Sequence, residues 1–240
     1  DRKKLNKIFN EKKYDIVFHF AALINNEESI EYPKKYFENN FIKGKIFIEN
    51  CIKNKVNKFI YSSTAAVYGN KNKQVNEKDD LKPMSPYPKS KLKLENFLIK
   101  KKKDIRCIIL RYFNVAGSDK KLRCGFNVKK GYNLILNLCN AVFKKKVFII
   151  NGGDYNTKDG TTIRDYIHVE DLARIHLLSA NLILKKKMFK ILNCGYGYGF
   201  SVKEILKKFN LISKNKVNYK IGKRRNSDIL ISISNPKKTN

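Results

Sequence analysis

The sequence predicts an α/β protein with an open parallel sheet, and two observations support that prediction. Short apolar runs alternate with longer segments of helical periodicity, as expected for βαβ units. Each of three predicted strands is also followed by a polar cluster, and open parallel sheets bind ligands at the carboxyl ends of their strands. The clusters are Asn25-Asn26, Ser62-Ser63-Thr64 and Asn114 before Gly117.

The first half of the chain contains the clearest alternation of strand and helix. Ile, Val and Phe fill the strand segments, which are short and bounded by turn-like residues. Apolar residues recur at helical spacing in the intervening segments, for example at Phe41, Ile48 and Ile52. Strands are expected at Asp15–Ala22, Lys58–Ser62 and Arg106–Tyr112, and helices at Tyr36–Asn54 and Lys89–Lys100.

After Gly117 the alternation is less regular, and no internal repeat or low-complexity linker interrupts the chain. Ser201 precedes a periodic segment and is a preferred residue type for a helix N-cap. The expected elements are a helix at Leu134–Lys145, a loop at Asn151–Thr162, a helix at Asp171–Lys185, a strand at Lys190–Cys194 and a helix at Ser201–Phe209.

The composition is that of a globular protein, with 42% hydrophobic and 30% charged residues among 240. A net charge of +31 suggests polyanion binding. The lysines, however, are spread over helices and loops, whereas a nucleic-acid site gathers them in a patch with stacking aromatic residues. We therefore expect no nucleic-acid partner. The apolar runs are short, so no signal peptide, membrane span or membrane partner is expected.

Cysteine usage indicates a reducing compartment, so a cytoplasmic location is expected. The chain has five cysteines, an odd number, widely spread and without a C-x-x-C pair. The same pattern argues against a metal site.

Tyr87, Lys91 and Thr64 are the candidate catalytic residues. Tyr87 and Lys91 stand four apart, and positions i and i+4 of a helix share a face, so the ammonium can lie beside the phenol. A nearby cation favours the phenolate, which makes tyrosine a usable general base. Thr64 follows a predicted strand and supplies a hydroxyl. The spacing alone also fits a surface lysine beside a half-buried tyrosine.

A series of motifs runs almost from end to end of the chain: His19–Ala22, Tyr61–Gly69, Ser85–Lys91, Leu110–Gly117, Asp159–Ala173, Asn193–Gly197 and Arg224-Arg225. With these motifs the chain resembles the UDP-glucose 4-epimerases, which are extended short-chain dehydrogenases/reductases. The segment Asp-Gly-Thr-x-x-Arg-Asp-Tyr-Ile-His-Val is nearly specific to these epimerases.

The resemblance implies a Rossmann-type doubly wound parallel sheet with a smaller C-terminal substrate-binding domain. Residues 1–116 would form the C-terminal part of the NAD-binding domain. Residues 117–240 would mainly bind the UDP-sugar, with about 165–200 returning to the sheet. No G-x-x-G-x-x-G loop occurs in the sequence, so the N-terminal βαβ part is expected to be missing. We expect these residues alone to bind NAD poorly.

The resemblance also implies a role for each matching residue. Tyr87 would be the base, Lys91 would hold the nicotinamide ribose and lower the pKa of Tyr87, and Thr64 would bridge the phenol and the sugar. The expected NAD contacts are Phe20, Ala21, Ala22, Asn39, Tyr87, Lys91 and Phe113. The expected UDP-sugar contacts are Thr64, Asn114, Asn133, Leu134, Arg164, Arg225, Asp228 and Ser232. From the residues alone, Arg164 equally fits an ion pair with the adjacent acidic cluster.

The implied activity is reversible NAD-dependent epimerisation at C4 of a UDP-hexose through a 4-keto intermediate. A 4,6-dehydratase needs an acid and a base after the threonine, and Ala65 and Ala66 cannot transfer protons. A UDP-glucuronate epimerase or decarboxylase, or a non-catalytic Rossmann-like binding protein, stays open as an alternative. Ser232, at a position that is a bulky tyrosine in some family members, is expected to leave room for an N-acetyl group. A homodimer is expected, built on the helices Tyr36–Asn54 and Lys89–Lys103.

Overall fold

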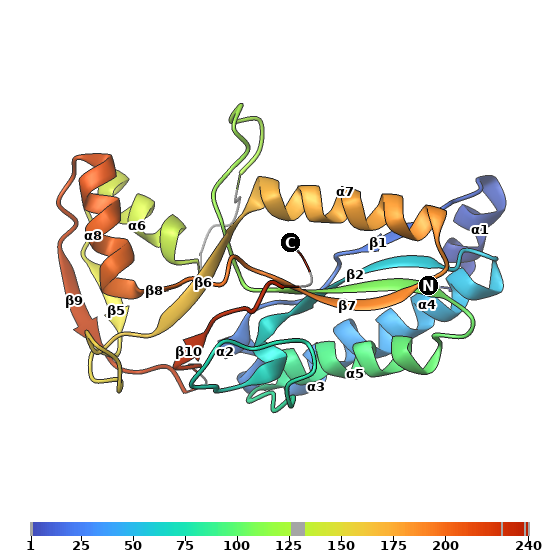
Figure 1. Ribbon diagram of the computed structural model, residues 1–240, viewed down its shortest axis with the longest axis horizontal. Coiled ribbons are helices and arrows are strands. Elements are labelled where there is room, and N and C mark those ends of the chain that lie inside the picture. The colour runs from blue at the N-terminus through green and yellow to red at the C-terminus, as the bar shows by residue number, and fades with distance from the viewer. Residues whose placement is uncertain (1, 126–132, 227, 238, 240) are drawn as a thin grey trace.

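The larger part of the molecule is a parallel sheet between two layers of helices (Figure 1). The computed structural model describes residues 2–125, 133–226, 228–237 and 239. Four strands pair in the order β1-β2-β3-β7, all in parallel, which confirms the predicted sheet. The strands are β1 (Val17–His19), β2 (Lys58–Thr64), β3 (Arg106–Tyr112) and β7 (Phe189–Cys194).

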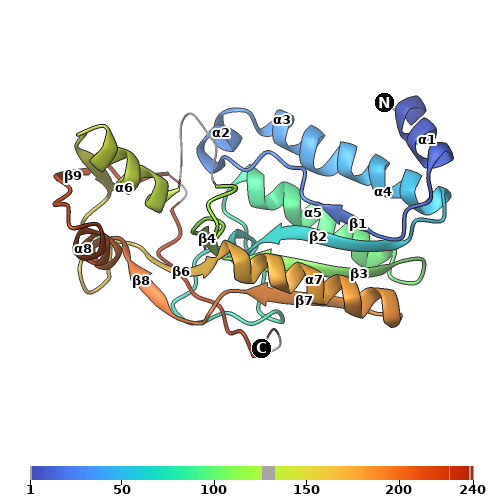
Figure 2. The ribbon, with the colours of Figure 1, turned by 90° about the horizontal axis from the view of Figure 1, so that it is seen from above.

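Helices cover both faces of this sheet. Helix α7 (Val169–Lys185) lies over one face, and α3, α4 and α5 lie against the other (Figures 1 and 2). The remaining elements of this part are α1 (Arg2–Glu11), α2 (Asn26–Glu31), α3 (Pro33–Tyr36), the π-helix η1 (Phe37–Ile42), α4 (Lys43–Lys53), the 3-10 helix η2 (Ala65–Tyr68) and α5 (Pro86–Lys100).

Helix α5 begins earlier than the sequence predicts, and this matters for Tyr87. Pro86 and Pro88 stand in its first turn, where the N–H that proline lacks would have no intrahelical partner. Tyr87 therefore lies inside the helix rather than before it. The helix expected at Tyr36–Asn54 forms as α3, η1 and α4 in succession.

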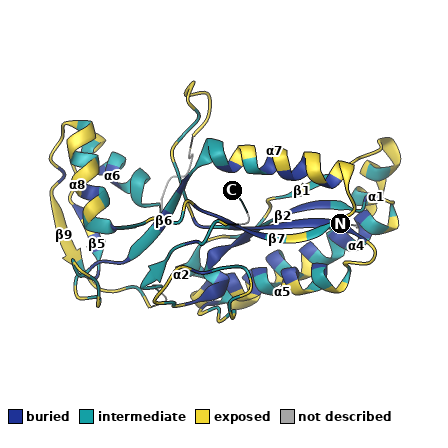
Figure 3. Cartoon of the chain, viewed as in Figure 1, coloured by how far each residue is buried: buried dark blue, intermediate teal, exposed yellow. Residues whose placement is uncertain are grey.

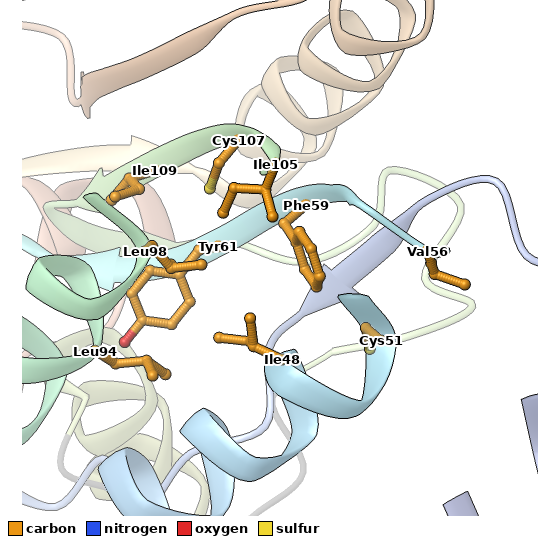
Figure 4. Close-up of a cluster of buried hydrophobic side chains, with 10 residues drawn as sticks. All are labelled: Ile48, Cys51, Val56, Phe59, Tyr61, Leu94, Leu98, Ile105, Cys107 and Ile109. Atoms are coloured by element: carbon orange, nitrogen blue, oxygen red, sulfur yellow. The ribbon is translucent and has the colours of Figure 1, made fainter. Parts of the chain in front are cut away.

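The side chains between the sheet and α4–α5 form the main core. Phe59, Tyr61 and Cys107 project from the strands, and Ile48 and Leu94 meet them from the helices (Figure 4). A second cluster packs under α7 through Ile108, Leu110 and Ile183. These buried strands carry apolar residues on both faces, as expected for a covered parallel sheet. Figure 3 shows the strands buried between helices with exposed outer surfaces.

A smaller part of the molecule carries two further sheets. One has the order β10-β6-β4, with β8 also paired to β6, and the other pairs β5 with β9. A third core cluster joins α6 and α8 to β5 through Leu138, Leu206 and Ile150. The elements are β4 (Asn114–Ala116), α6 (Leu134–Phe143), β5 (Phe148–Asn151), β6 (Ile163–His168), β8 (Gly199–Ser201), α8 (Val202–Ser213), β9 (Tyr219–Gly222) and β10 (Ile231–Ser232).

Two sets of polar contacts stabilise the smaller part of the molecule. Ser201 caps α8 in a capping box with Glu204, which confirms its prediction as an N-cap. The buried carboxylate of Asp165, on β6, accepts hydrogen bonds from the backbone N–H groups of Tyr196, Gly197 and Ser234 at 2.9 to 3.1 Å. It also accepts one from the Ser234 hydroxyl at 2.5 Å. Asp165 thus joins three segments that are distant in sequence.

Among the described residues, no helix is long and apolar enough to cross a membrane. The cysteines that the structure describes are all free, with Cys51, Cys107 and Cys194 buried in the core. Within the same ranges, no group of three His, Cys, Asp or Glu side chains could hold a metal ion.

Candidate active site

Thr64, Tyr87 and Lys91 meet where β2 ends and α5 begins. Thr64 is the last residue of β2, and its hydroxyl accepts a hydrogen bond from the N–H of Ala66 at 3.2 Å. The Thr64 side chain faces the Tyr87 phenol closely enough to affect the ionisation of that phenol. Lys91 follows Tyr87 by one turn of α5. The structure therefore brings these three residues together at the carboxyl end of the parallel sheet.

Burial controls the protonation of the pair on α5. It raises the pKa of the Tyr87 phenol, and the neighbouring Thr64 side chain opposes that rise. It lowers the pKa of Lys91 to about 7, an effect that the charge of Glu95 opposes. The lowering of the Tyr87 pKa by Lys91 stays a prediction, because burial is the largest influence on Tyr87 in this structure.

Lys91 is held by an aromatic ring rather than by a carboxylate. Its ammonium lies 4.5 Å from the centre of the Tyr61 ring. The Tyr61 hydroxyl donates to the backbone carbonyl of Lys91 at 3.3 Å. In the described chain no salt bridge reaches Lys91, although only 2% of its surface is exposed. The ammonium is consequently free to bind groups that enter the site.

Asn40 positions the segment after β1 against α5, a role that no local residue pattern indicates. Its side-chain oxygen accepts from the Leu23 N–H at 2.8 Å, and its amide nitrogen donates to the Leu23 carbonyl at 2.9 Å. The same nitrogen donates to the Ser90 hydroxyl at 3.0 Å, which in turn donates to the Tyr87 carbonyl at 2.6 Å. The neighbouring predicted contact, Asn39, only supports this network through a bond to Asn40.

The predicted NAD contacts lie around the same end of the sheet. Phe20, Ala21 and Ala22 follow β1, and the Phe20 ring stacks on Phe18 with 56% of its surface exposed. Asn39 lies in η1. Phe113 differs from the others because it is buried against Val67 and its neighbours. The structure thus places most of this group around the catalytic residues and Phe113 beneath them.

Arg164, Asp228 and Ser232 form one group in the smaller part of the molecule. The Arg164 guanidinium and the Asp228 carboxylate form an ion pair at 3.2 Å, and Tyr155 donates to the other carboxylate oxygen at 3.1 Å. Ser232 on β10 is the register partner of Arg164 on β6. The sequence allowed an ion pair between Arg164 and the adjacent acidic cluster. The partner is instead Asp228, itself an expected substrate contact.

Asn133, Leu134 and Asn114 form a second group. Asn133 caps α6 by accepting from the N–H groups of Ile135 and Leu136, and it donates to the Val115 carbonyl at 3.0 Å. Leu134 is the first residue of α6, and Asn114, an exposed residue, begins β4 next to Val115. The Asn133 side chain therefore fixes the start of α6 beside β4.

Arg225 lines a pocket that joins the two parts of the molecule. This pocket of about 430 Å³ is bounded by α2 on one side and by residues 223–226 on the other. The Arg225 guanidinium forms an ion pair with Glu27 at 3.2 Å, and both side chains are partly exposed. Neighbouring Arg224 pairs with Asp154 at 2.7 Å instead. A guanidinium facing an open pocket is suited to bidentate binding of a phosphate.

The parallel sheet, with threonine, tyrosine and lysine at its carboxyl end, defines a short-chain dehydrogenase/reductase type of protein. The model of the NAD dependent epimerase/dehydratase family matches residues 1–195. The chain therefore belongs to that family.

Three similar proteins are UDP-glucose 4-epimerases or a UDP-Glc/GlcNAc 4-epimerase. The chain is 36% identical to UDP-glucose 4-epimerase of Azospirillum brasilense over 228 residues, 93% of this chain and 66% of that protein. The Bifidobacterium longum UDP-glucose 4-epimerase, solved with NAD+ and UDP, is 32% identical with a TM-score of 0.94. The UDP-Glc/GlcNAc 4-epimerase of Campylobacter jejuni is 38% identical with a TM-score of 0.81.

The chain is shorter than these proteins. The match to the Bifidobacterium longum structure covers 100% of this chain and 73% of that one. The match to the Campylobacter jejuni structure covers 99% of this chain and 74% of that one.

Proposed function

We propose that this chain performs reversible NAD-dependent epimerisation at C4 of a UDP-hexose, interconverting UDP-galactose and UDP-glucose. The observation that carries this proposal is the grouping of Thr64, the last residue of β2, with Tyr87 and Lys91, one turn apart on α5, at the carboxyl end of the sheet. Ala65 and Ala66 follow Thr64 in η2. Neither has a group that transfers protons, so elimination of water from the sugar has no acid or base at this position.

The residues present fit the ribose end of NAD. Lys91 offers a buried ammonium with no salt bridge in the described chain, which suits the ribose hydroxyls. Ala21 and Ala22 are small residues beyond the end of β1, where a nicotinamide ring could approach the backbone. Lys91 and Tyr87 would hold the nicotinamide ribose, with Asn39 alongside. NAD held there would supply the hydride chemistry, acceptance from C4 and return to the opposite face of the sugar.

Residues of this chain would remove and return the proton of the sugar 4-hydroxyl. Tyr87 removes the proton from the 4-hydroxyl, and Thr64 shares a hydrogen bond between the phenol and that hydroxyl. Lys91 stabilises the phenolate through its positive charge. Proton return by Tyr87 completes the inverted product after the 4-keto sugar has turned in the site.

The uridine diphosphate would bind in the smaller part of the molecule. Arg164 and Arg225 suit the two phosphates, and Asp228 suits a ribose hydroxyl. Asn114, Asn133 and Leu134 would contact the sugar and base. Ser232, beside Arg164 in the sheet, leaves space for a larger substituent, so we include N-acetylated UDP-hexoses among the substrates.

The test is conversion of UDP-galactose to UDP-glucose by the protein expressed from its complete coding sequence. Tyr87→Phe removes only the phenolic hydroxyl, so we expect turnover to fall by about 10² to 10⁴-fold. Binding of UDP, measured by isothermal titration, is expected to change little. A Tyr87→Phe protein that turns over at the wild-type rate would overturn the proposal.

The family resemblance supports a homodimer in the cytoplasm as part of this proposal. Helices α3, η1 and α4 lie beside α5 on one face of the sheet (Figure 2). Two copies of this helix face would form a four-helix interface. Sedimentation equilibrium is expected to give twice the chain mass, and a monomer at micromolar concentration would contradict it. The free cysteines fit a reducing compartment.

A further inference from the structure

A buried polar network lies one helical turn beyond Lys91. The Glu95 carboxylate on α5 is completely buried, and Arg111 on β3 is 2% exposed. Arg111 binds Glu95 with Nη2 at 2.7 Å and with Nε at 3.2 and 3.3 Å. Ser63, next to Thr64 on β2, also donates to the carboxylate. The carboxylate is therefore fixed by groups from two strands.

The guanidinium of Arg111 is fixed in turn from its other side. Its Nη1 donates to the Tyr68 hydroxyl at 2.9 Å, and Tyr68 donates to Asn193 at 2.7 Å. Asn193 completes the network with a bond from its amide nitrogen to the Val75 carbonyl at 2.9 Å. Because every member has its partners, the network holds one geometry.

Two cations, Lys91 and Arg111, lie beside one fully buried carboxylate, Glu95. A second carboxylate, Glu77, accepts from the Asn193 N–H at the far end of the network. Tyr87, Lys91 and Glu95 occur at i, i+4 and i+8, so they share one face of α5. Arg111 takes the hydrogen bonds of Glu95, whereas Lys91 interacts with it only through charge.

We propose that Glu95, clamped by Arg111 and Ser63, is a positioning residue that supplies the negative charge which Lys91 needs to remain an ammonium ion beside Tyr87. This inference rests on the proposed function. Glu95 touches neither the phenol nor a ligand; it acts through Lys91. Arg111 has the opposite effect, because its positive charge competes with Lys91 for the same carboxylate.

Among the groups around Lys91, only Glu95 supplies negative charge to it. The phenols are neutral and the guanidinium of Arg111 is positive. His19 is also neutral, because burial and the Lys91 charge lower its pKa to about 4. The titratable and charged groups facing this region are His19 from β1, Tyr61 from β2, Tyr68 from η2, Tyr87 and Glu95 from α5, and Cys107, Arg111 and Tyr112 from β3. Glu77, in the segment before α5, faces the Tyr68 and Asn193 side of the network rather than Lys91.

The test compares two variants that break the same ion pair from opposite ends. Glu95→Gln removes the negative charge, so Lys91 loses its proton at lower pH. Activity at pH 8 is then expected to fall at least tenfold, and the alkaline limb of the kcat profile moves to lower pH. Arg111→Gln leaves Glu95 facing Lys91 alone, so the limb moves to higher pH. A purely structural role predicts no opposite shifts.

A second measurement does not depend on turnover. The 13Cε NMR shift of Lys91 in protein labelled with 13C-lysine, assigned by its loss in Lys91→Met, follows the Lys91 proton directly and needs no access by a reagent. The titration midpoint is expected at lower pH in Glu95→Gln and at higher pH in Arg111→Gln. These shifts without any epimerase activity would refute the proposed function and keep the charge relation. Activity with an unshifted midpoint would refute the charge relation alone.

Leu98→Ala is the matched control for loss of stability. Leu98 is completely buried on α5 and carries no charge. Its truncation is expected to lower the melting temperature and leave the pH profile in place. If Glu95→Gln does not fold, Glu95→Asp decides the question. The shorter side chain withdraws the carboxylate, and a smaller shift to lower pH is expected. An unshifted profile in Glu95→Asp would overturn the proposal.

Discussion

The two ends of the candidate site are held by different physical means. Around Lys91 the groups are buried, and their protonation is set by desolvation and by one carboxylate. Around Arg225 the ion pair with Glu27 is partly exposed to solvent and borders an open pocket. Removing the partner of a buried charge costs several kcal/mol of stability. An exposed ion pair contributes little to stability, so a ligand displaces one of its partners easily.

This difference matches the separate tasks that the two ends would perform. Proton transfer requires fixed geometry and a tuned pKa, which the sheet and α5 provide. Binding and release of a diphosphate require cations whose resting partners can be displaced. The difference leads to four predictions, ordered by the size of the expected effect.

Lys91→Met should separate activity from stability. The loss of the ammonium is expected to lower kcat by about 10² to 10⁴-fold. Because burial depresses the pKa of Lys91 in the folded state, the charged amine opposes folding fully below pH 7. That opposition fades as the pH rises towards the ordinary lysine value. The variant should therefore be more stable, by roughly 1 to 4 kcal/mol below pH 7, and less so at pH 9.

Thermal unfolding of Lys91→Met at several pH values checks this. Lys89→Met, at an exposed position of the same helix, is the control and should change neither quantity. A Lys91→Met protein that is less stable than wild type at pH 6 would contradict the account of desolvation.

Arg225→Met should affect recognition and leave the chemical step intact. Hydrogen bonds to a charged group contribute about 1.5 to 3 kcal/mol, so KM is expected to rise by roughly 10 to 100-fold. The kcat should remain at the wild-type value. Arg224→Met is the matched control, because Arg224 pairs with Asp154 and lies over the Tyr155 ring. Equal effects of the two variants on KM would refute the assignment to Arg225.

Ser232→Tyr tests the width of the sugar site. A bulky ring beside Arg164 should reduce turnover of UDP-GalNAc at least tenfold and leave that of UDP-galactose within a few-fold. Ser232→Ala, which keeps the side chain small, should preserve both. Comparing kcat/KM for the two substrates gives the answer. No turnover of UDP-GalNAc by the wild-type protein would exclude N-acetylated substrates.

Glu27→Gln should have the smallest effect, and it should improve ligand binding where the other variants impair binding or turnover. Glu27 neutralises Arg225 in this structure, so a diphosphate must displace it. Removing its charge is expected to tighten UDP binding about two- to fivefold, in line with the small free energy of exposed ion pairs. Isothermal titration at low salt measures this. Glu31 lines the same pocket without pairing with Arg225, so Glu31→Gln is the control. Weaker binding in Glu27→Gln would show that Glu27 helps the ligand.

The sequence was most informative where the deciding contacts are local. The i, i+4 spacing brought Tyr87 and Lys91 onto one helix, and β3 begins and ends at the predicted residues. The small sheets of the second part were not predicted: most of their strands are too short for a periodic pattern, and the six-residue β6 was missed as well. β4 and β8 have three residues each, and β10 has two.

Contacts between segments that are distant in sequence could not be predicted. Asn40 meets Ser90 fifty positions along the chain, and Arg164 meets Asp228 sixty-four positions along. Neither pairing leaves a local pattern of residue types, so the sequence indicates neither the role of Asn40 nor the partner of Arg164. The Glu95–Arg111 pair also joins a helix to a strand, and only the packing of α5 on the sheet reveals it.

The carboxylate of Asp165 has a consequence for the order in which the sheets can fold during synthesis. Its hydrogen-bond donors are supplied by residues 196, 197 and 234, so they leave the ribosome after Asp165 itself. Until residue 234 emerges, this carboxylate lacks part of its donor set and β6 lacks its partner β10. The sheet that carries Arg164 and Ser232 is therefore completed late in synthesis, after the strands β1, β2 and β3 are already available to pair.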